Sequence, residues 1–242
     1  MNDSRVVDAS HPTTDTLANL RDVGGLHTTD GRTTRFGVLY RGDAPYQGDS
    51  RPTSVSAWPP AVVVDLRSSA EVERNPFDWG PATVRHHQPL HDGADPTEDL
   101  PPELAGLYAQ ILDSAADRVA SLLTIVAYTS GPTLLHCAAG KDRTGVATAA
   151  LLLATDVEPD DVVGDYLHTA AHMPALARRW KAKAIRASGG RALPPQWLTA
   201  PETAITSVVE RLTSWRGGAS GWLLDHGADE RDLAHWRARL IE

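Results

Sequence analysis

A cysteine and an arginine six positions after it form the most reactive combination in this sequence. Cys137 is the only cysteine among 242 residues, and Arg143 follows it in the stretch HCAAGKDRTG. A cysteine attacks as its thiolate, which a nearby guanidinium and a helix N-terminus both stabilise. A guanidinium also binds two oxygens of a phosphoryl group at once. The spacing therefore favours nucleophilic attack by Cys137 on a phosphate ester that Arg143 holds.

Small residues between these two side chains allow the backbone to wrap closely around an anion. The candidate phosphate-binding residues are those that follow the cysteine: Ala138, Ala139, Gly140, Lys141, Asp142, Arg143 and Thr144. We expect Lys141 to add positive charge at the rim and Thr144 to offer a hydroxyl to the departing thiolate. The alternative for Cys137 is a buried structural thiol, a common state of free cysteines.

Other catalytic loops fit this stretch poorly. A Walker loop has a glycine five positions ahead of the glycine of a Gly-Lys pair and Ser or Thr after that pair, where this chain has Leu135 and Asp142. The Gly-x-Ser-x-Gly turn of a serine nucleophile does not occur in the sequence. His86, His87 and His91 suggest a metal, but neighbours on a predicted strand point to opposite faces. We therefore expect no metal ion and no other cofactor.

Strand and helix patterns place the loop between a buried strand and a helix. Residues 133–137 (TLLHC) form a short apolar run typical of a buried strand, and a helical pattern begins at about Arg143. Further strands are predicted at 36–41, 61–67 and 83–90. Open α/β sheets bind ligands at the carboxyl ends of their strands, which is where this loop falls.

The whole chain predicts an α/β fold with a helical C-terminal part. We expect a central, mainly parallel sheet of four or five strands flanked by helices, with one continuous helix over 103–128. Residues 1–15 have the composition of a disordered lead-in. Residues 16–242 are expected to form a single domain, because no clean linker divides them, with a helical cap or lid over 160–200.

Composition argues against several kinds of partner. The net charge of −8 disfavours a nucleic-acid-binding protein. The N-terminus lacks the apolar core of a secretion signal, and the longest apolar run, 146–154, is too short to span a bilayer. We expect a cytoplasmic protein without a transmembrane segment, and export without a cleaved signal stays open. The frequent use of Ala, Asp, Thr and Arg indicates a GC-rich bacterial gene.

The loop HCAAGKDRTG resembles the Cys-x5-Arg-Thr signature of the protein-tyrosine phosphatase superfamily. Its Gly-Lys-Asp-Arg core is similar to the atypical bacterial branch, which includes the mycobacterial protein tyrosine phosphatase B type. Further segments resemble that branch in the same order: NLRDVGG (19–25), VLYRGD (38–43), VVDLRSSAEV (63–72), VVGDYLHT (162–169) and the C-terminal stretch 217–240. The chain departs from the branch at Gly42, where serine is usual, and at Ala70, where a longer residue is common.

This resemblance implies a tyrosine-phosphatase-like fold and hydrolysis of a phosphate monoester through a phosphocysteine on Cys137. The leaving oxygen needs a proton, and two carboxylates are candidates for the acid. Asp92 follows a predicted strand where the family carries a loop aspartate facing the cysteine. Asp142 lies inside the signature loop, where the branch also has an aspartate. Both candidates stay open.

Four further residues are expected to support the site. His136 precedes the cysteine and is expected to order the loop by hydrogen bonding. Asp65 and Arg67 end a predicted strand near the same rim and are expected to hold the loop, with a contact between Arg67 and substrate left open. Arg21 is expected to have a structural role in preference to a contact with substrate.

A basic stretch and the substrate class each leave alternatives. Residues 175–192 contain six basic residues and no acidic one, which suits either a solvated helix face or a lid that meets an anionic substrate. The first substrate choice, by resemblance, is a phosphotyrosine protein or a phosphoinositide. The second is a nucleotide, sugar or natural-product phosphate, and the third is a phosphate-binding module without activity. The sequence does not specify an oligomeric state.

Overall fold

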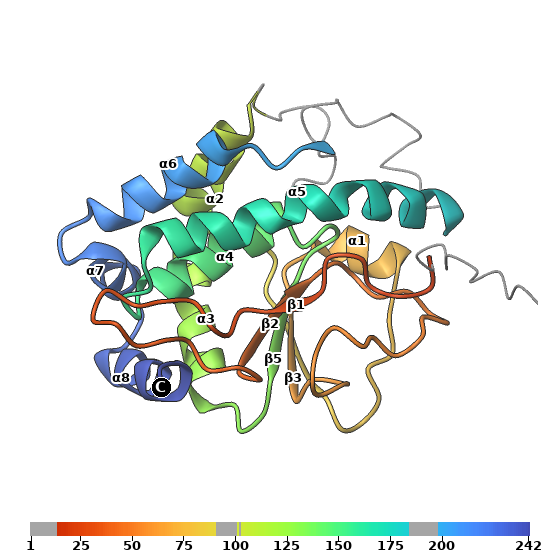
Figure 1. Ribbon diagram of the computed structural model, residues 1–242, viewed down its shortest axis with the longest axis horizontal. Coiled ribbons are helices and arrows are strands. Elements are labelled where there is room, and N and C mark those ends of the chain that lie inside the picture. Colours follow the sequence, from red (N-terminus) through yellow and green to blue (C-terminus); the bar gives the residue numbers. More distant parts are fainter. Residues whose placement is uncertain (1–13, 91–100, 102, 184–197) are drawn as a thin grey trace, which may run out of the picture.

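The computed structural model describes these parts of the chain: residues 14–90, 101, 103–183 and 198–242. Most of the expected lead-in and part of the expected cap therefore lie outside the described residues. The described segments form one five-stranded sheet with helices packed around it (Figure 1). The α/β fold with a central, mainly parallel sheet that the sequence predicts is confirmed.

The sheet places a buried strand at its centre. The strands are β1 (Arg21–Asp22), β2 (Leu39–Gly42), β3 (Val62–Asp65), β4 (Val84–His87) and β5 (Thr133–His136). They lie in the order β1-β2-β5-β3-β4, and only the β1–β2 pair is antiparallel. Val62 and Val64 pack into the larger core, whereas Val63 packs into a second core on the opposite face. Burial on both faces explains why the sequence of β3 is a continuous apolar run.

Helices supply most of the larger core. They are α1 (Ser69–Arg74), α2 (Leu104–Ser114), α3 (Ala116–Tyr128), α4 (Asp142–Leu153), α5 (Pro159–Ala182), α6 (Glu202–Thr213), α7 (Gly218–Asp225) and α8 (Glu230–Leu240). This core takes buried residues from every helix from α2 to α8 and from β2, β3 and β5. No helix in the described segments combines the length and apolarity needed to cross a bilayer.

The single helix expected over 103–128 is wrong, because the chain forms two helices there. Ala115 separates α2 from α3, with φ −128° and ψ 23°. The hydroxyl of Ser114 donates to Gln110 O at 2.7 Å, a kind of bond that often bends a helix. Ala115 itself is fully buried, so the bend is part of the packed core.

The register of the parallel strands brings their carboxyl ends to one edge of the sheet. Gly42 of β2 and Asp65 of β3 both lie opposite His136 of β5, and His87 of β4 lies opposite Asp65. The segments that follow β2 and β3 therefore lie on either side of the segment that contains Cys137. Figure 1 shows α5, the long helix, crossing the molecule above the sheet.

Candidate active site

Cys137 follows the central strand β5 and is buried at the carboxyl edge of the sheet. Segments after the two neighbouring strands hold its surroundings in place. Ala44 N donates to Ala138 O at 3.3 Å, and Leu66 N donates to His136 O at 2.9 Å. Helix α4 begins at Asp142, so only four residues separate the cysteine from a helix N-terminus. Such a terminus favours a thiolate and binds anions.

Gly140 is the position in this loop that requires glycine. Its φ of +68° lies in the left-handed region. A Cβ atom built there would lie 2.4 Å from both C and O of Gly42, and backbone atoms at that distance cannot move aside cheaply. The loop therefore turns directly against the end of β2. Gly140 was predicted to let the backbone approach an anion closely, and in the structure it also lets the loop approach the backbone of Gly42.

The guanidinium of Arg143 is held by a carboxylate that sequence reasoning did not identify. Its Nη1 and Nη2 donate to Oε2 and Oε1 of Glu71 at 2.5 Å and 2.9 Å. Burial alone would raise the pKa of Glu71, but the hydrogen bonds and charge of Arg143 lower it to about 2. Arg143 is 16% exposed, so the guanidinium is accessible while its orientation is fixed.

Glu71 is itself fixed by the start of α1. Ser68 N donates to Glu71 Oε2 at 2.8 Å, and Glu71 N donates to Ser68 Oγ at 3.3 Å, which is a capping box. The motif S-x-x-E is visible in the sequence as a helix start. Its partner across the fold is not, because 72 positions separate Glu71 from Arg143.

Lys141 was predicted to lie at the rim of the site, and this prediction is wrong. Its side chain is 1% exposed, and its Nζ donates to Thr199 O at 2.7 Å and lies 3.5 Å from Asp142 Oδ1. A buried ammonium needs such partners to offset the loss of water. The lysine therefore ties the loop to the segment that precedes α6.

Asp142, the first residue of α4, lies beside two buried tyrosines. Tyr108 Oη donates to Asp142 Oδ1 at 2.8 Å and lies 2.6 Å from Tyr166 Oη. Burial and the neighbouring Asp142 carboxylate raise the pKa of Tyr108 well above its usual value, so this phenol is a donor at neutral pH. The Asp142 side chain remains 19% exposed. This geometry suits a carboxylate held in one orientation with access to solvent.

His136, Asp65 and Arg67 form a buried group behind the cysteine. Arg67 donates to both oxygens of Asp65, at 2.8 Å and 2.6 Å, and its side chain is 4% exposed. Burial lowers the pKa of His136 to about 4, and Asp65 offsets only part of that effect. His136 Nδ1 lies 3.4 Å from Cys137 O. The group is therefore placed to order the loop from behind the cysteine.

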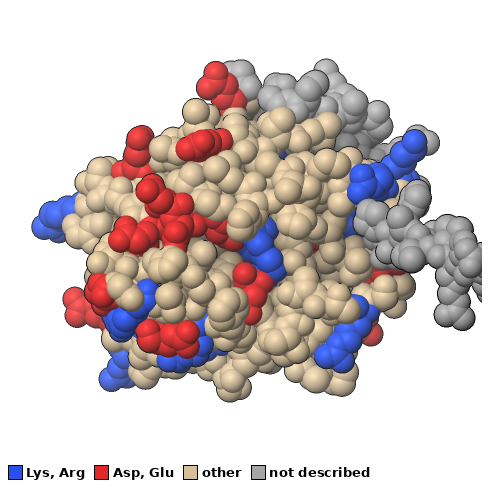
Figure 2. All heavy atoms as spheres, in the orientation of Figure 1, with Lys and Arg blue, Asp and Glu red and all other residues tan. Residues whose placement is uncertain are grey.

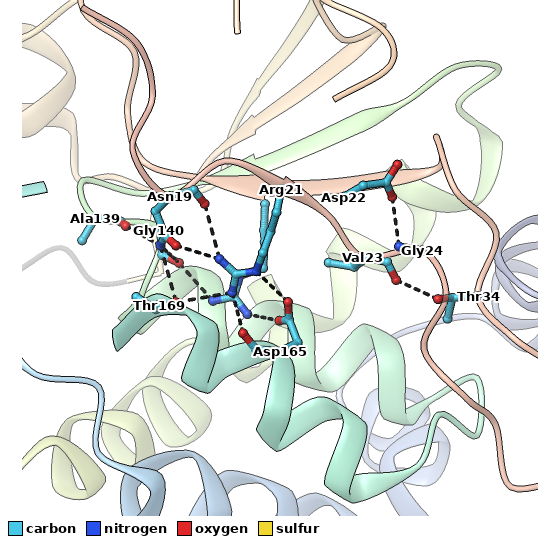
Figure 3. A network of polar contacts seen from close by, with 11 residues as sticks. Asn19, Arg21, Asp22, Val23, Gly24, Thr34, Ala139, Gly140, Asp165 and Thr169 are labelled. Carbon is cyan, nitrogen blue, oxygen red and sulfur yellow. Dashed lines mark hydrogen bonds and ion pairs between the residues drawn. The ribbon is translucent and has the colours of Figure 1, made fainter. Parts of the chain in front are cut away.

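Arg21 and Arg41 share one carboxylate on α5. Arg21 Nε donates to Asp165 Oδ1 at 2.7 Å, and Arg41 Nη1 pairs with Asp165 Oδ2. Burial and the charge of Arg41 lower the pKa of Arg21 to about 10, which leaves it protonated at neutral pH. Asn19 completes the network, since its side chain contacts both Arg21 and the loop (Figure 3). Arg21 thus links Asn19 to α5.

The described part of the basic stretch, which ends at Lys183, holds two exposed basic residues, Arg178 and Lys181, and two that form ion pairs. Arg179 is 1% exposed and pairs with Asp43 at 3.1 Å and also with Asp49. Lys183 pairs with Asp15 and Asp49 at 3.2 Å and 3.3 Å. These two basic residues anchor α5 to the segments that precede β1 and follow β2. On the face shown in Figure 2, basic side chains lie apart, and acidic ones gather on its left half.

Three further expectations from the sequence concern Thr144, Asp92 and a metal ion. The hydroxyl of Thr144 is buried and has no hydrogen-bond partner among the described residues. Asp92 lies outside the described residues. Within those residues, no three His, Cys, Asp or Glu side chains are grouped in a way that could hold a metal ion.

The chain is similar in sequence to known tyrosine phosphatases. A model of the tyrosine phosphatase family matches residues 12–242. A Cupriavidus necator protein that bears the name of a tyrosine-protein phosphatase is 34% identical over 64% of this chain. That alignment spans 61% of the Cupriavidus protein, so the chain covers about three fifths of its length.

Two further relatives are similar to the chain over more of its length. The triple specificity protein phosphatase PtpB of Mycobacterium tuberculosis is 28% identical, across 92% of this chain and 96% of that protein. A tyrosine-protein phosphatase of Nostoc commune is 26% identical, across 73% of this chain and 65% of that protein. The resemblance inferred from the loop and its flanking motifs is confirmed. The chain belongs to the tyrosine phosphatase family, a family of phosphoric monoester hydrolases.

Proposed function

We propose that this protein hydrolyses phosphate monoesters through a phosphocysteine on Cys137. The observation that carries the proposal is the buried thiol at the foot of a four-residue loop, with an oriented Arg143 at the helix start. Loop amides and a guanidinium can stabilise the charge on the transferring phosphoryl group. The family match and the names of the relatives support this reaction class.

The reaction divides into two displacements at phosphorus. In the first, the Cys137 thiolate forms a sulfur–phosphorus bond while the ester oxygen leaves and takes a proton from a carboxylic acid. In the second, the same carboxylate removes a proton from water, whose oxygen attacks phosphorus, and the thiolate leaves as phosphate is released. The hydroxyl of Thr144 is suited to stabilise that departing thiolate.

Asp142 and Asp92 are the candidates for the acid. Asp142 has support from its position one residue before Arg143, from its partial exposure and from the fixed orientation that the bond from Tyr108 gives its carboxylate. Asp92 has support from its place after a strand in the family pattern. Replacing each by alanine separates them, because the variant that lacks the acid loses the basic limb of the pH–rate profile.

The substrate proposed first is a phosphotyrosine side chain, because the relatives include proteins named as tyrosine-protein phosphatases. The test measures phosphate release from an aryl phosphate, a phosphotyrosine peptide, a phosphoserine peptide, a phosphoinositide and nucleoside monophosphates. We expect the phosphotyrosine peptide to give the highest kcat/KM and Cys137→Ser to be inactive on all of them. A parent protein that releases phosphate from none of these, or an active serine variant, would overturn the proposal.

A further inference from the structure

The outer face of the loop is held by side chains from the N-terminal segment. Asn19 Nδ2 donates to Ala139 O at 2.9 Å and to Gly140 O at 3.3 Å. Arg41 Nη2 donates to the same Gly140 oxygen at 3.0 Å (Figure 3 shows the Asn19 side of this network). Two consecutive carbonyl groups of the loop are therefore bound from one side. Asn19 and Ala139 are 120 positions apart in the sequence.

Because the peptide bond is planar, the direction of each carbonyl group fixes the direction of the N–H group that follows it. In a trans peptide the C=O and the following N–H point in opposite directions. The carbonyl of Ala139 shares its plane with the N–H of Gly140, and the carbonyl of Gly140 shares its plane with the N–H of Lys141. With both oxygens drawn toward Asn19 and Arg41, both N–H groups face away from those side chains, toward the inside of the loop.

We infer that Asn19 is a positioning residue, which together with Arg41 turns the amides of Gly140 and Lys141 toward the phosphoryl group. This inference rests on the proposed function, because it names residues that shape the same oxyanion site. Donors fixed in advance around a developing charge cost no reorganisation during the reaction. An Asn19 amide that points at carbonyl oxygens therefore acts on catalysis through the backbone, without touching the substrate.

The side-chain amide of Asn19 can adopt only one orientation here. Its Oδ1 accepts from Arg21 Nη1 at 2.7 Å, and a guanidinium cannot accept a hydrogen bond. The NH2 group must therefore face the loop carbonyls. The backbone is also fixed, because Asn19 N donates to Asp43 Oδ1 at 2.8 Å, and the residue is fully buried.

Asp165 on α5 holds both guanidiniums that support this arrangement. It pairs with Arg21, which orients Asn19, and with Arg41, which binds the loop directly.

The test compares Asn19→Ala with Thr34→Val as a matched control. Thr34 is also fully buried in the N-terminal segment, and its hydroxyl donates to Val23 O at 2.7 Å, away from the loop. We expect Asn19→Ala to lower kcat on an aryl phosphate by about tenfold to a hundredfold, since losing one oxyanion donor costs about a hundredfold or more. Vanadate, which mimics the transition state, should lose affinity by a similar factor, and phosphate by less.

A second readout needs no turnover. Loop amides that face inward also stabilise the thiolate, so the rate of Cys137 alkylation by iodoacetamide at neutral pH, relative to alkaline pH, should fall in Asn19→Ala. Thr34→Val should lower Tm but keep the vanadate affinity and the alkylation ratio of the parent. If Asn19→Ala keeps both, or if Thr34→Val loses both at an equal loss of Tm, the inference is wrong.

Arg41→Lys provides a second variant if Asn19→Ala does not fold. Lysine keeps a positive charge beside Asp165 but lacks the planar fork that reaches Gly140 O. The same fall in vanadate affinity and alkylation ratio is expected, and parent-like values would overturn the inference. A parent that binds vanadate without releasing phosphate from any ester would contradict the proposed function alone, because these two readouts would still decide the role of Asn19.

Discussion

Replacing Glu71 by glutamine should weaken both the fold and the reaction. Glutamine keeps an oxygen for Ser68 N but places an NH2 group where Arg143 now donates, so one of the two ion-paired hydrogen bonds is lost. The fall in the pKa of Glu71 from 4.5 to about 2 corresponds to about 3 kcal/mol of stabilisation at neutral pH. Because Glu71 is 26% exposed, we expect a loss of about 2 kcal/mol in the variant.

The pH dependence of that loss follows from the sign of the pKa change. The folded-state pKa of Glu71 is lowered, so its stabilisation is fully present above about pH 4.5 and disappears as the pH falls toward 2. In a protein of this size, 2 kcal/mol lowers Tm by about 4 to 8 °C. The Tm difference between parent and Glu71→Gln should therefore be constant near neutral pH and shrink on acidification.

Thermal unfolding and steady-state kinetics on an aryl phosphate provide the assay. An Arg143 guanidinium that is no longer held by two bonds should lower kcat by about tenfold, because positioning is part of the barrier. Glu73→Gln is the matched control, since Glu73 lies on the same helix and is exposed. A Glu71→Gln protein with the Tm and kcat of the parent, or a Glu73→Gln protein with equal losses, would refute this account of Arg143.

Three further substitutions test other contacts of the site. Gly140→Ala should lower kcat at least tenfold and lower the free energy of unfolding by more than about 2 kcal/mol, because the new Cβ would meet the backbone of Gly42. Gly31→Ala is the control: Gly31 also has a positive φ, +85°, but open space around it. This variant should lose only about 1 kcal/mol of stability and keep the kcat of the parent. Tyr108→Phe should slow alkyl phosphates about five- to tenfold more than aryl phosphates if Asp142 is the acid, since poor leaving groups need the proton most; equal slowing would contradict that role. Burial lowers the pKa of His136 to about 4, so about 3 kcal/mol of stability should be lost as the pH falls from 6.5 to 4, and His136→Gln should remove this slope in a pH series of unfolding curves.

The features that follow from neighbouring residues were predictable from the sequence. The apolar run before Cys137, the small residues after it and the helical pattern beyond Arg143 specify strand, loop and helix without reference to the rest of the chain. The parallel sheet follows from alternating strands and helices. The left-handed turn at Gly140 is equally local, because few other residues adopt that φ.

Contacts between distant segments were not predictable in the same way. Nothing in the S-x-x-E pattern at Ser68 distinguishes a helix cap from a clamp on Arg143, since both use the same carboxylate. Lys141 reads as a surface charge because lysines are rarely buried, and only the fold brings Thr199 O to it. The break at the buried Ala115, beside the bond from the Ser114 hydroxyl, leaves no mark in the spacing of the apolar residues.

The central claim is that phosphate passes through a covalent bond to Cys137, and trapping that bond tests it most directly. The parent protein is mixed with an aryl phosphate, quenched within the first turnovers and analysed by peptide mass spectrometry. We predict a mass increase of one phosphoryl group on the peptide that contains Cys137, and its absence in Cys137→Ser. Hydrolysis that proceeds with no adduct, or with an adduct on another residue, would contradict the account.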